Sequence, residues 1–190
     1  MKFIHTIDNL MPASYATYIE NTLLGATSSV PWDFLEDVTY TNAREAGLEL
    51  NPAFEHVYFA GGQIHTEFFH IVVPVFHQAL AKINYTGSLE LVKVRSFLQL
   101  PSIKRKEYNN IHVDLDFPHL VCLYYVNDVD GDTFIFDDNN QIISTITPKK
   151  NRVVLFDGSL RHSSSKPTTG PRTNINFDLV VEFDKVNLPL

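Results

Sequence analysis

The stretch from residue 112 to residue 136, HVDLDFPHLVCLYYVNDVDGDTFIF, decides the fold that the sequence predicts. Residues 121–127 are rich in β-branched and aromatic side chains, which is typical of a buried strand. Residues 127–132 carry Asn, Asp and Gly, which favour a turn. Residues 133–136 form a second apolar run, so the sequence predicts two strands joined as a hairpin.

The same pattern continues on both sides of this stretch. Apolar runs at residues 142–146 and 153–156 predict two more strands, residues 92–100 predict one before them, and residues 174–183 predict the last. Strands at this spacing, separated by polar turns, indicate a protein built mainly of antiparallel sheet.

The N-terminal half predicts two helices. Asp8 and Asn9 suggest a cap for a helix whose apolar positions fall between Tyr15 and Leu23, and residues 67–83 also have apolar side chains at helical spacing. We expect both helices to pack on one sheet. The predicted fold class is therefore mostly β with flanking helices, an α+β arrangement.

Two candidate metal ligands stand at the start of the opening stretch. His112 and Asp114 are two residues apart, so both side chains would point to one face if residues 111–115 are extended. A third candidate, His162, follows the strand expected at residues 153–156. Two imidazoles and one carboxylate leave open positions on an ion, a donor set typical of non-heme Fe(II) sites. The alternative for the bare His-x-Asp pattern is a surface histidine beside a solvated carboxylate.

With these pieces in place, residues 91–181 resemble the Fe(II)/2-oxoglutarate-dependent oxygenase superfamily, prolyl-4-hydroxylase type. The resemblance rests on the following pieces: His112-Val113-Asp114, Tyr124-Tyr125-Val126-Asn127, Gly131 before Phe134-Ile135-Phe136, Pro148 to Phe156, His162 and Arg172. Within the superfamily, the sequence of these segments is most similar to that of small phage-encoded oxygenases. The resemblance implies a double-stranded β-helix, a cupin-like jelly roll of two sheets with the metal between them.

The resemblance also implies roles for these residues. His112, Asp114 and His162 would hold Fe(II), and the co-substrates 2-oxoglutarate and O2 would take the open positions. Arg172 matches the family's position for the cation that binds the far carboxylate of 2-oxoglutarate, which a guanidinium can grip with two parallel hydrogen bonds. Tyr125 is implied to donate its hydroxyl to the same carboxylate.

Three further positions bear on the co-substrate pocket. Asn174 lies two residues after Arg172, so we expect its amide on the same face and in the same pocket. Many relatives have a Tyr in contact with the co-substrate before a proline, and here Leu100 stands at that place before Pro101. Relatives often have a second Gly where this chain has Asp132, so the loop beside the substrate is expected to differ.

Two other segments resemble metal-binding motifs but do not have the residue spacing that those motifs require. His65 and His70 are five residues apart, whereas a zinc-protease helix needs an interval of four, so these histidines are expected to be ordinary helix residues. Residues 128–132 resemble part of a calcium loop, but the glycine is misplaced and no Glu closes the pattern. We therefore interpret residues 128–132 as a turn.

Composition sets the remaining bounds. With 190 residues and 44% hydrophobic residues, residues 1–190 are expected to form a single domain, in which 1–90 support a catalytic core at 91–183. The lone Cys122 predicts a buried thiol and no intrachain disulfide.

The formal charge of −7 disfavours a protein whose main task is binding nucleic acid, and no apolar stretch is long enough for a membrane span. A cytoplasmic location is expected.

The basic cluster Lys104-Arg105-Lys106 lies between two predicted strands close to His112. One hypothesis is a lid that steers an anionic substrate or 2-oxoglutarate, and the alternative is an ordinary solvated loop.

The expected function is hydroxylation of a substrate C–H bond with release of succinate and CO2, and by resemblance the substrate is a peptidyl proline or another protein side chain. Two alternatives stay open. One is hydroxylation of a free amino acid, small metabolite or nucleobase at the same site. The other is a cupin-like metal- or ligand-binding module without turnover, which would need no carboxylate anchor such as Arg172 with Tyr125.

Overall fold

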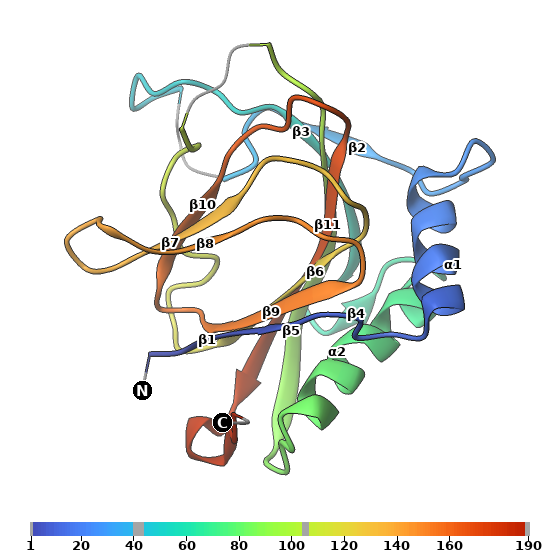
Figure 1. The fold of residues 1–190 in the computed structure, drawn as a ribbon, viewed down its shortest axis with the longest axis vertical. Helices are drawn as coiled ribbons and strands as arrows, with labels where there is room; N and C mark the ends of the chain where they lie inside the picture. Colours follow the sequence, from blue (N-terminus) through green and yellow to red (C-terminus); the bar gives the residue numbers. More distant parts are fainter. Residues whose placement is uncertain (1, 40–43, 104–106, 189–190) are drawn as a thin grey trace.

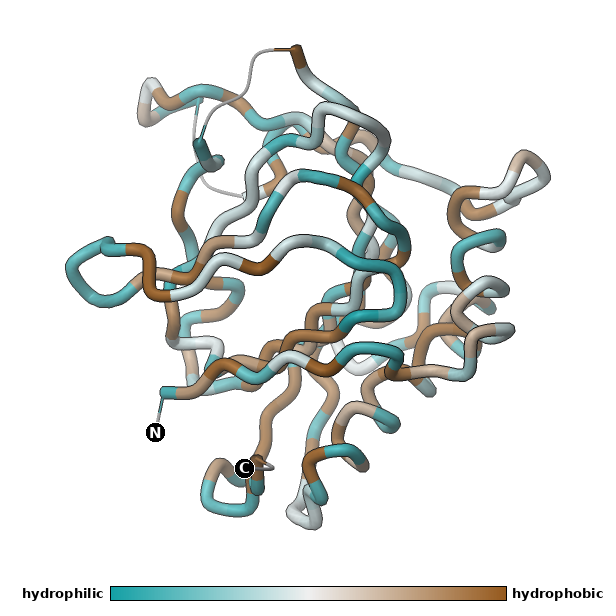
Figure 2. Tube along the Cα trace, in the orientation of Figure 1, coloured by the Kyte–Doolittle hydropathy of each residue, from teal (hydrophilic) through white to brown (hydrophobic). Residues whose placement is uncertain are grey.

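The computed structural model describes residues 2–39, 44–103 and 107–188. Within these residues the fold is a jelly roll: a larger and a smaller antiparallel sheet face each other, and helices cover the outside of the larger one (Figure 1). The predicted fold class is therefore confirmed. Figure 2 shows that apolar residues concentrate in the strands and helices, while the loop that joins β7 and β8 is hydrophilic.

The larger sheet has the strand order β1-β9-β6-β11-β5-β3-β2, with β4 paired to β3. Its strands are β1 (Ile4–Ile7), β2 (Asp33–Leu35), β3 (Ala53–Ala60), β4 (Gln63–Ile64), β5 (Leu89–Gln99), β6 (Leu120–Tyr125), β9 (Arg152–Asp157) and β11 (Arg172–Val181). The two longest strands, β5 and β11, are neighbours at its centre, and together they form the longest continuous wall of the barrel.

The smaller sheet has the order β10-β7-β8, with β7 at Thr133–Phe136, β8 at Ile142–Ile146 and β10 at Arg161–Ser164. The predicted hairpin between residues 121–127 and 133–136 is wrong, because β6 pairs with β9 and β11 whereas β7 pairs with β8 and β10. In a jelly roll the chain passes from one sheet to the other, so residues 126–132 bridge the two sheets instead of forming a tight turn.

Helices α1 (Ala13–Leu24) and α2 (Phe69–Lys82) pack on the outer face of the larger sheet, as predicted (Figure 1). The predicted cap at Asp8 and Asn9 is wrong: α1 begins after Pro12 without a side-chain cap, and Asp8 instead accepts hydrogen bonds from Arg152. A short 3-10 helix, η1 (Phe183–Lys185), follows β11. Among the described residues, no helix is both long and apolar enough to cross a membrane.

Strand β6 shows how the sheet divides two cores. Leu123 and Tyr125 face the core between the sheets, whereas Cys122 and Tyr124 face the core under the helices. Side chains alternate between the two faces of a strand, so an uninterrupted apolar run is what a strand with two buried faces requires. Cys122 is buried, as the sequence predicted.

Strand β11 breaks this pattern. Its outward side chains Ile175, Phe177 and Leu179 are apolar and belong to the core under the helices. Its inward side chains are polar and buried: Arg172, Asn174, Asn176 and Asp178. Burying a row of polar groups is costly unless they bind partners, so this row marks the part of the barrel interior where a functional site belongs.

Candidate metal centre and anion pocket

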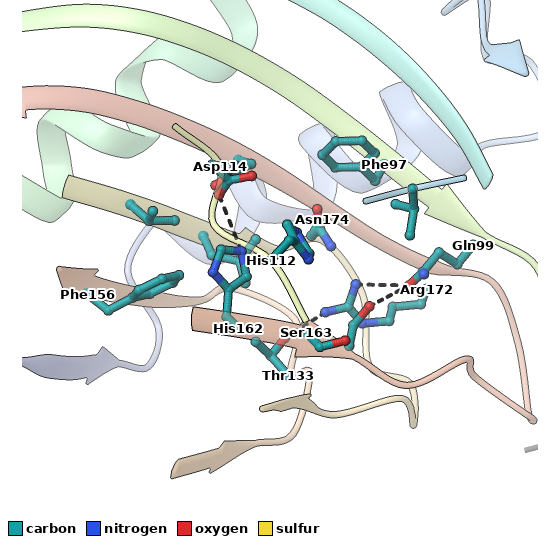
Figure 3. Close-up of a pocket in the computed structure, with 15 residues that line it drawn as sticks. Phe97, Gln99, His112, Asp114, Thr133, Phe156, His162, Ser163, Arg172 and Asn174 are labelled. Carbon is teal, nitrogen blue, oxygen red and sulfur yellow. Dashed lines mark hydrogen bonds and ion pairs between the residues drawn. The ribbon is translucent and has the colours of Figure 1, made fainter. Parts of the chain in front are cut away.

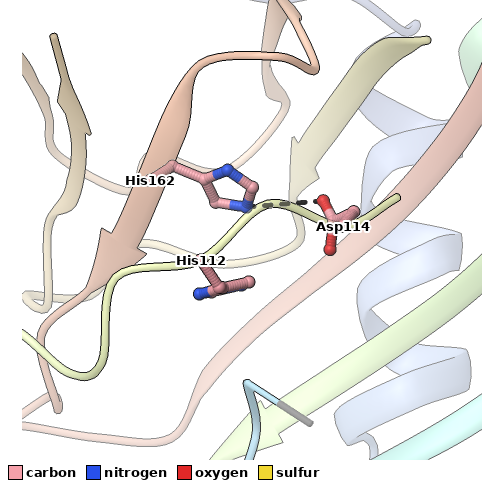
Figure 4. Close-up of side chains that lie close together, drawn as sticks. All are labelled: His112, Asp114 and His162. Atoms are coloured by element: carbon pink, nitrogen blue, oxygen red, sulfur yellow. Dashed lines mark ion pairs between the residues drawn. The ribbon is translucent and has the colours of Figure 1, made fainter. Parts of the chain in front are cut away.

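The structure brings the three predicted metal ligands together. Ligand atoms of His112, Asp114 and His162 all lie within 4.8 Å of one another (Figure 4). His162 is on β10, and its backbone N–H donates to the carbonyl of His112, whose N–H donates back to the carbonyl of His162. This pair of bonds fixes His112 against the smaller sheet.

The predicted strand over residues 111–115 is only partly present. His112 makes an isolated bridge to His162, and the chain leaves extended pairing by Asp114. The two ligands share a face because the chain bends between two sheets, which strand spacing alone did not indicate.

Both histidines have the orientation expected of metal ligands. Nδ1 of His112 lies 3.1 Å from the carbonyl oxygen of Asn110, and Nδ1 of His162 lies 3.3 Å from that of Leu160. A carbonyl oxygen only accepts hydrogen bonds, so in each ring the proton belongs on Nδ1 and the lone pair on Nε2. Nε2 of His162 is 3.4 Å from Oδ2 of Asp114, so a proton on Nε2 would pair with the carboxylate, and once that proton is lost the Nε2 lone pair is available to an ion between them.

The charges of the cluster suit a divalent cation. Burial, reinforced by His162, lowers the pKa of His112 to about 4, so its ring is neutral near pH 7. Burial would raise the pKa of Asp114, but the neighbouring His162 brings it below its usual value. Burial would lower the pKa of His162, but Asp114 raises it overall. A metal ion would therefore meet an ionised carboxylate and displace a proton from His162.

A cavity connects this cluster to Arg172 (Figure 3). Its wall also includes Val38, Phe97, Gln99, Val121, Leu123, Thr133, Phe156, Ser163, Ser164, Asn174 and Asn176. The cavity thus connects a ligand cluster to a buried guanidinium, and apolar side chains from β6 and β9 also line it.

Arg172 is held rigidly at the start of β11. Its Nε donates to the Gly131 carbonyl at 2.8 Å, Nη1 to Gln99 Oε1 at 3.2 Å and Nη2 to Thr133 Oγ1 at 2.8 Å. A guanidinium has five N–H donors, so these bonds leave two for an anion in the cavity. Gly131 has φ +99°, and a Cβ there would lie 2.9 Å from the carbonyl oxygen of Ser165, so a glycine is required.

Thr133 links Arg172 to the predicted Tyr125. The Tyr125 hydroxyl donates to Thr133 Oγ1 at 2.7 Å, and Arg172 donates to the same oxygen. A hydroxyl oxygen that accepts two hydrogen bonds has its own proton left to donate, and Thr133 lines the cavity. The structure therefore places a donor from Thr133 beside Arg172, with Tyr125 behind it. Direct contact between Tyr125 and 2-oxoglutarate stays a prediction.

Asn174 lies in the cavity wall, as predicted, and its buried Oδ1 has no hydrogen-bond partner among the described residues. Leu100 is 55% exposed, whereas the preceding Gln99 is 2% exposed and binds Arg172. The place of the Tyr found in many relatives is thus not reproduced at Leu100, and Gln99 supplies a polar group to the pocket instead. The proposed lid, Lys104-Arg105-Lys106, lies outside the described residues.

Sequence reasoning missed several residues of the site. Gln99 and Thr133 contact Arg172, and Arg95, Asn176 and Asp178 surround Asp114. The signal for two of them was present, because the spacing of two that connects Arg172 to Asn174 continues to Asn176 and Asp178. The others depend on which strands pair across the sheet.

No protein-family model and no curated protein matches the sequence. Solved structures do match. An oxidoreductase of the 2OG-Fe(II) oxygenase family from Burkholderia pseudomallei has a TM-score of 0.71 at 9% identity, over 93% of this chain and 84% of that chain. A prolyl hydroxylase from Trichoplax adhaerens, in complex with a hypoxia inducible factor peptide, has a TM-score of 0.62 at 18% identity, over 93% of this chain and 82% of that chain.

A third match is a viral collagen prolyl hydroxylase from Paramecium Bursaria Chlorella virus-1 in its 2OG complex, with a TM-score of 0.56 at 13% identity over 94% of this chain and 96% of that chain. The chain has the 2-oxoglutarate oxygenase fold. At these identities the oxygenase fold is what the comparisons establish, and the resemblance stated from the sequence is confirmed at that level.

Proposed function

We propose that this protein is an Fe(II)- and 2-oxoglutarate-dependent dioxygenase that hydroxylates a substrate C–H bond and releases succinate and CO2. The observation that carries the proposal is that one cavity holds the His112, Asp114 and His162 cluster at one end and Arg172 at the other. A simple metal-binding module needs no buried guanidinium opposite its metal, so the inert cupin alternative is disfavoured.

The donor set fits Fe(II). Both rings can present Nε2 lone pairs once the metal has displaced the proton of His162, the carboxylate is held ionised, and three protein ligands leave the remaining positions of an octahedral ion for the co-substrates. When bound, Fe(II) with 2-oxoglutarate would supply the oxidising power of the reaction by activating O2.

The chain's own residues bind and orient the co-substrate. The free N–H groups of Arg172 and the hydroxyl of Thr133 would bind its far carboxylate, whose charge would be costly in this setting without them. Val121, Leu123 and Phe156 also line the cavity and would exclude water, which strengthens both polar ends.

For the primary substrate we propose a peptidyl proline as the first class to test. Support comes from the prolyl hydroxylases among the similar structures, one of which is in complex with a peptide. A free amino acid, small metabolite or nucleobase is the alternative for the same site. An alpha ketoglutarate dependent epimerase from nogalamycin biosynthesis has a similar fold, so the fold alone selects neither the reaction nor the substrate.

The reaction is tested by following succinate formation in aerated protein with Fe(II) and 2-oxoglutarate. Proline-containing peptides and free amino acids are added in separate arms, and the His162→Ala variant is the matched blank. We expect succinate above that blank, with the largest increase in the peptide arm. Wild type that neither forms succinate faster than His162→Ala nor binds 2-oxoglutarate would contradict the oxygenase proposal.

A further inference from the structure

Asp114 is held from behind by three residues that are not candidate metal ligands. Arg95 Nη2 lies 3.5 Å from Asp114 Oδ1, and Asn176 Nδ2 donates to Asp114 Oδ2 at 3.2 Å. Asp178 joins the two, since its Oδ1 accepts from Asn176 Nδ2 at 3.3 Å and its Oδ2 lies 3.9 Å from Arg95 Nη2. We call Arg95, Asn176 and Asp178 the carboxylate bracket.

The bracket is built by strand register. Arg95 on β5 lies directly opposite Asn176 on β11, and Asp178 is two residues further along β11 on the same face. All three are almost completely buried, with exposures of 2%, 4% and 0%. The guanidinium also lies over the ring of Phe97, 4.9 Å from its centroid, which restricts its orientation. The bracket is therefore a rigid part of the barrel wall.

Donor and acceptor chemistry gives each bracket residue one orientation. Carboxylate oxygens of ionised Asp114 only accept, so the side-chain nitrogen of Asn176 must face that carboxylate. Asp178 accepts from the same nitrogen and keeps the amide from turning over. Arg95 faces Oδ1 of Asp114, whereas His162 faces Oδ2.

The two oxygens of Asp114 are consequently not equivalent. Oδ1 faces a buried cation, and Oδ2 faces the ligand cluster while it accepts one bond from Asn176. A metal ion that reached Oδ1 as well would come up against the positive charge of Arg95. The geometry favours binding through Oδ2 alone.

We propose that Arg95, Asn176 and Asp178 are positioning residues that make Asp114 a one-oxygen metal ligand and so keep a coordination position open. This inference rests on the proposed metal site. In an octahedral site, one oxygen from Asp114 with two histidines leaves three positions, enough for a chelating co-substrate and O2. A carboxylate that bound through both oxygens would occupy one of them.

A second cation is the competing interpretation of the same region. Ligand atoms of Asp114, His119 and Asp178 also lie within 4.8 Å of one another. The bracket interpretation disfavours this site, because Arg95 already places a positive charge beside both carboxylates. The two interpretations predict different metal counts: one ion per chain for the bracket, two for the alternative.

The test uses Mn(II) as the probe, bound to the purified protein without 2-oxoglutarate. Relaxation of solvent protons reports how many exchangeable water molecules the bound ion carries. The key variant is Arg95→Met/Asp178→Asn, which removes the buried cation together with its second acidic partner. Removing both is better tolerated than removing one, which leaves an unpaired buried charge. Thermal melting checks that the variant is folded.

We expect wild type to bind one Mn(II) that carries three exchangeable waters. In the double variant the relaxation enhancement per bound ion should fall by roughly one third, as three waters become two. Metal affinity should fall about 10- to 100-fold, as is common when residues behind a ligand are changed. The single variant Arg95→Lys, which keeps the charge, should retain the wild-type enhancement. Lys82→Met removes an exposed positive charge from the last turn of α2, outside the bracket, and should leave the enhancement unchanged.

The outcomes separate the two proposals. Wild type that binds no Mn(II) would overturn the proposed metal site itself. A folded double variant with wild-type enhancement would overturn the bracket, whatever its affinity. Two ions bound to wild type would also overturn it in favour of the second cation site.

Discussion

The two ends of the cavity are built from different kinds of backbone. At the anion end, Arg172, Gln99 and Thr133 come from strands β11, β5 and β7. At the metal end, His162 is on the short β10, and His112 and Asp114 belong to a segment with one isolated bridge. The anion end is fixed by continuous strand pairing, whereas the metal end needs extra contacts to hold its ligands.

These extra contacts come from backbone carbonyls and from side chains behind the ligands. At the metal end each histidine is oriented by a backbone carbonyl, and Asp114 is oriented by Arg95 and Asn176, which come from the same long strands that build the anion end. Strands β5 and β11 thus position both ends, one directly and the other through side chains behind the ligand. Variants that change one end of the cavity and leave the other intact test whether the two ends are positioned in these two different ways.

The largest effect is expected from removing a ligand at the metal end. His162→Ala or Asp114→Ala should abolish stoichiometric Fe(II) binding and turnover, because two remaining ligands do not make the three-ligand site. Metal content after anaerobic Fe(II) loading and gel filtration is the measurement. His77→Ala, on the exposed side of α2, is the matched control and should load normally. Full loading of both ligand variants would disprove the assignment.

The next effect is expected at the anion end. Arg172→Ala should weaken 2-oxoglutarate binding by about 2–5 kcal/mol, or about 30-fold to a few thousand-fold, because the far carboxylate loses its buried partner. Arg172→Lys keeps the charge but loses the planar fork and should fall between Ala and wild type. Calorimetric titration measures the affinity. Fe(II) binding should persist in both variants, and its loss would mean that the two ends are not independent.

Thr133 provides a sharper test of the same end. Thr133→Val removes the hydroxyl proposed to donate to the carboxylate, and a bond to a charged group is worth about 1.5–3 kcal/mol, so affinity should fall about 10- to 150-fold. Tyr125→Phe keeps the ring beside Arg172 and removes the hydroxyl that donates to Thr133, so it should cost about 0.5–1.5 kcal/mol.

Thr173→Val makes the same change on the opposite face of β11 and is the control for Thr133→Val. If Tyr125→Phe weakened binding more than Thr133→Val, Tyr125 rather than Thr133 would be the direct contact.

A further effect is a pH dependence confined to the metal end. His162 has a pKa above its usual value of 6.5, so below that pKa the metal must displace one proton. Mn(II) affinity should therefore fall about tenfold for each unit of decreasing pH, and His112, with a pKa of about 4, should not add to this slope near neutrality. Mn(II) titrations between about pH 5 and 8 measure it. A slope of two protons would contradict a neutral His112.

Much of the anion end could be predicted from the sequence, because strand periodicity and the family resemblance together pointed to Arg172 and Asn174. Gln99 was not predicted. The resemblance gave Leu100 only as the place of a missing Tyr, and neighbouring side chains on a strand point to opposite faces, so it carried no information about Gln99.

The metal end was predicted as a set of residues but not as a geometry. His112 and Asp114 were assigned to a strand that is largely absent, and the hairpin expected after them crosses between sheets instead. Arg95 was not predicted, because its role depends on lying opposite Asn176. These two residues are about eighty positions apart in the sequence, and their pairing is known only from the folded sheet.

The central claim is that one cavity holds a metal at one end and the far carboxylate of 2-oxoglutarate at the other. Its most direct test is titration of 2-oxoglutarate into anaerobic Fe(II) protein while the metal-to-ligand charge-transfer absorption is followed. We predict a saturable band in wild type, a band that needs much more 2-oxoglutarate in Arg172→Ala, and no band in His162→Ala. A wild type without a band at millimolar 2-oxoglutarate, or with equal titrations for wild type and Arg172→Ala, would contradict the account.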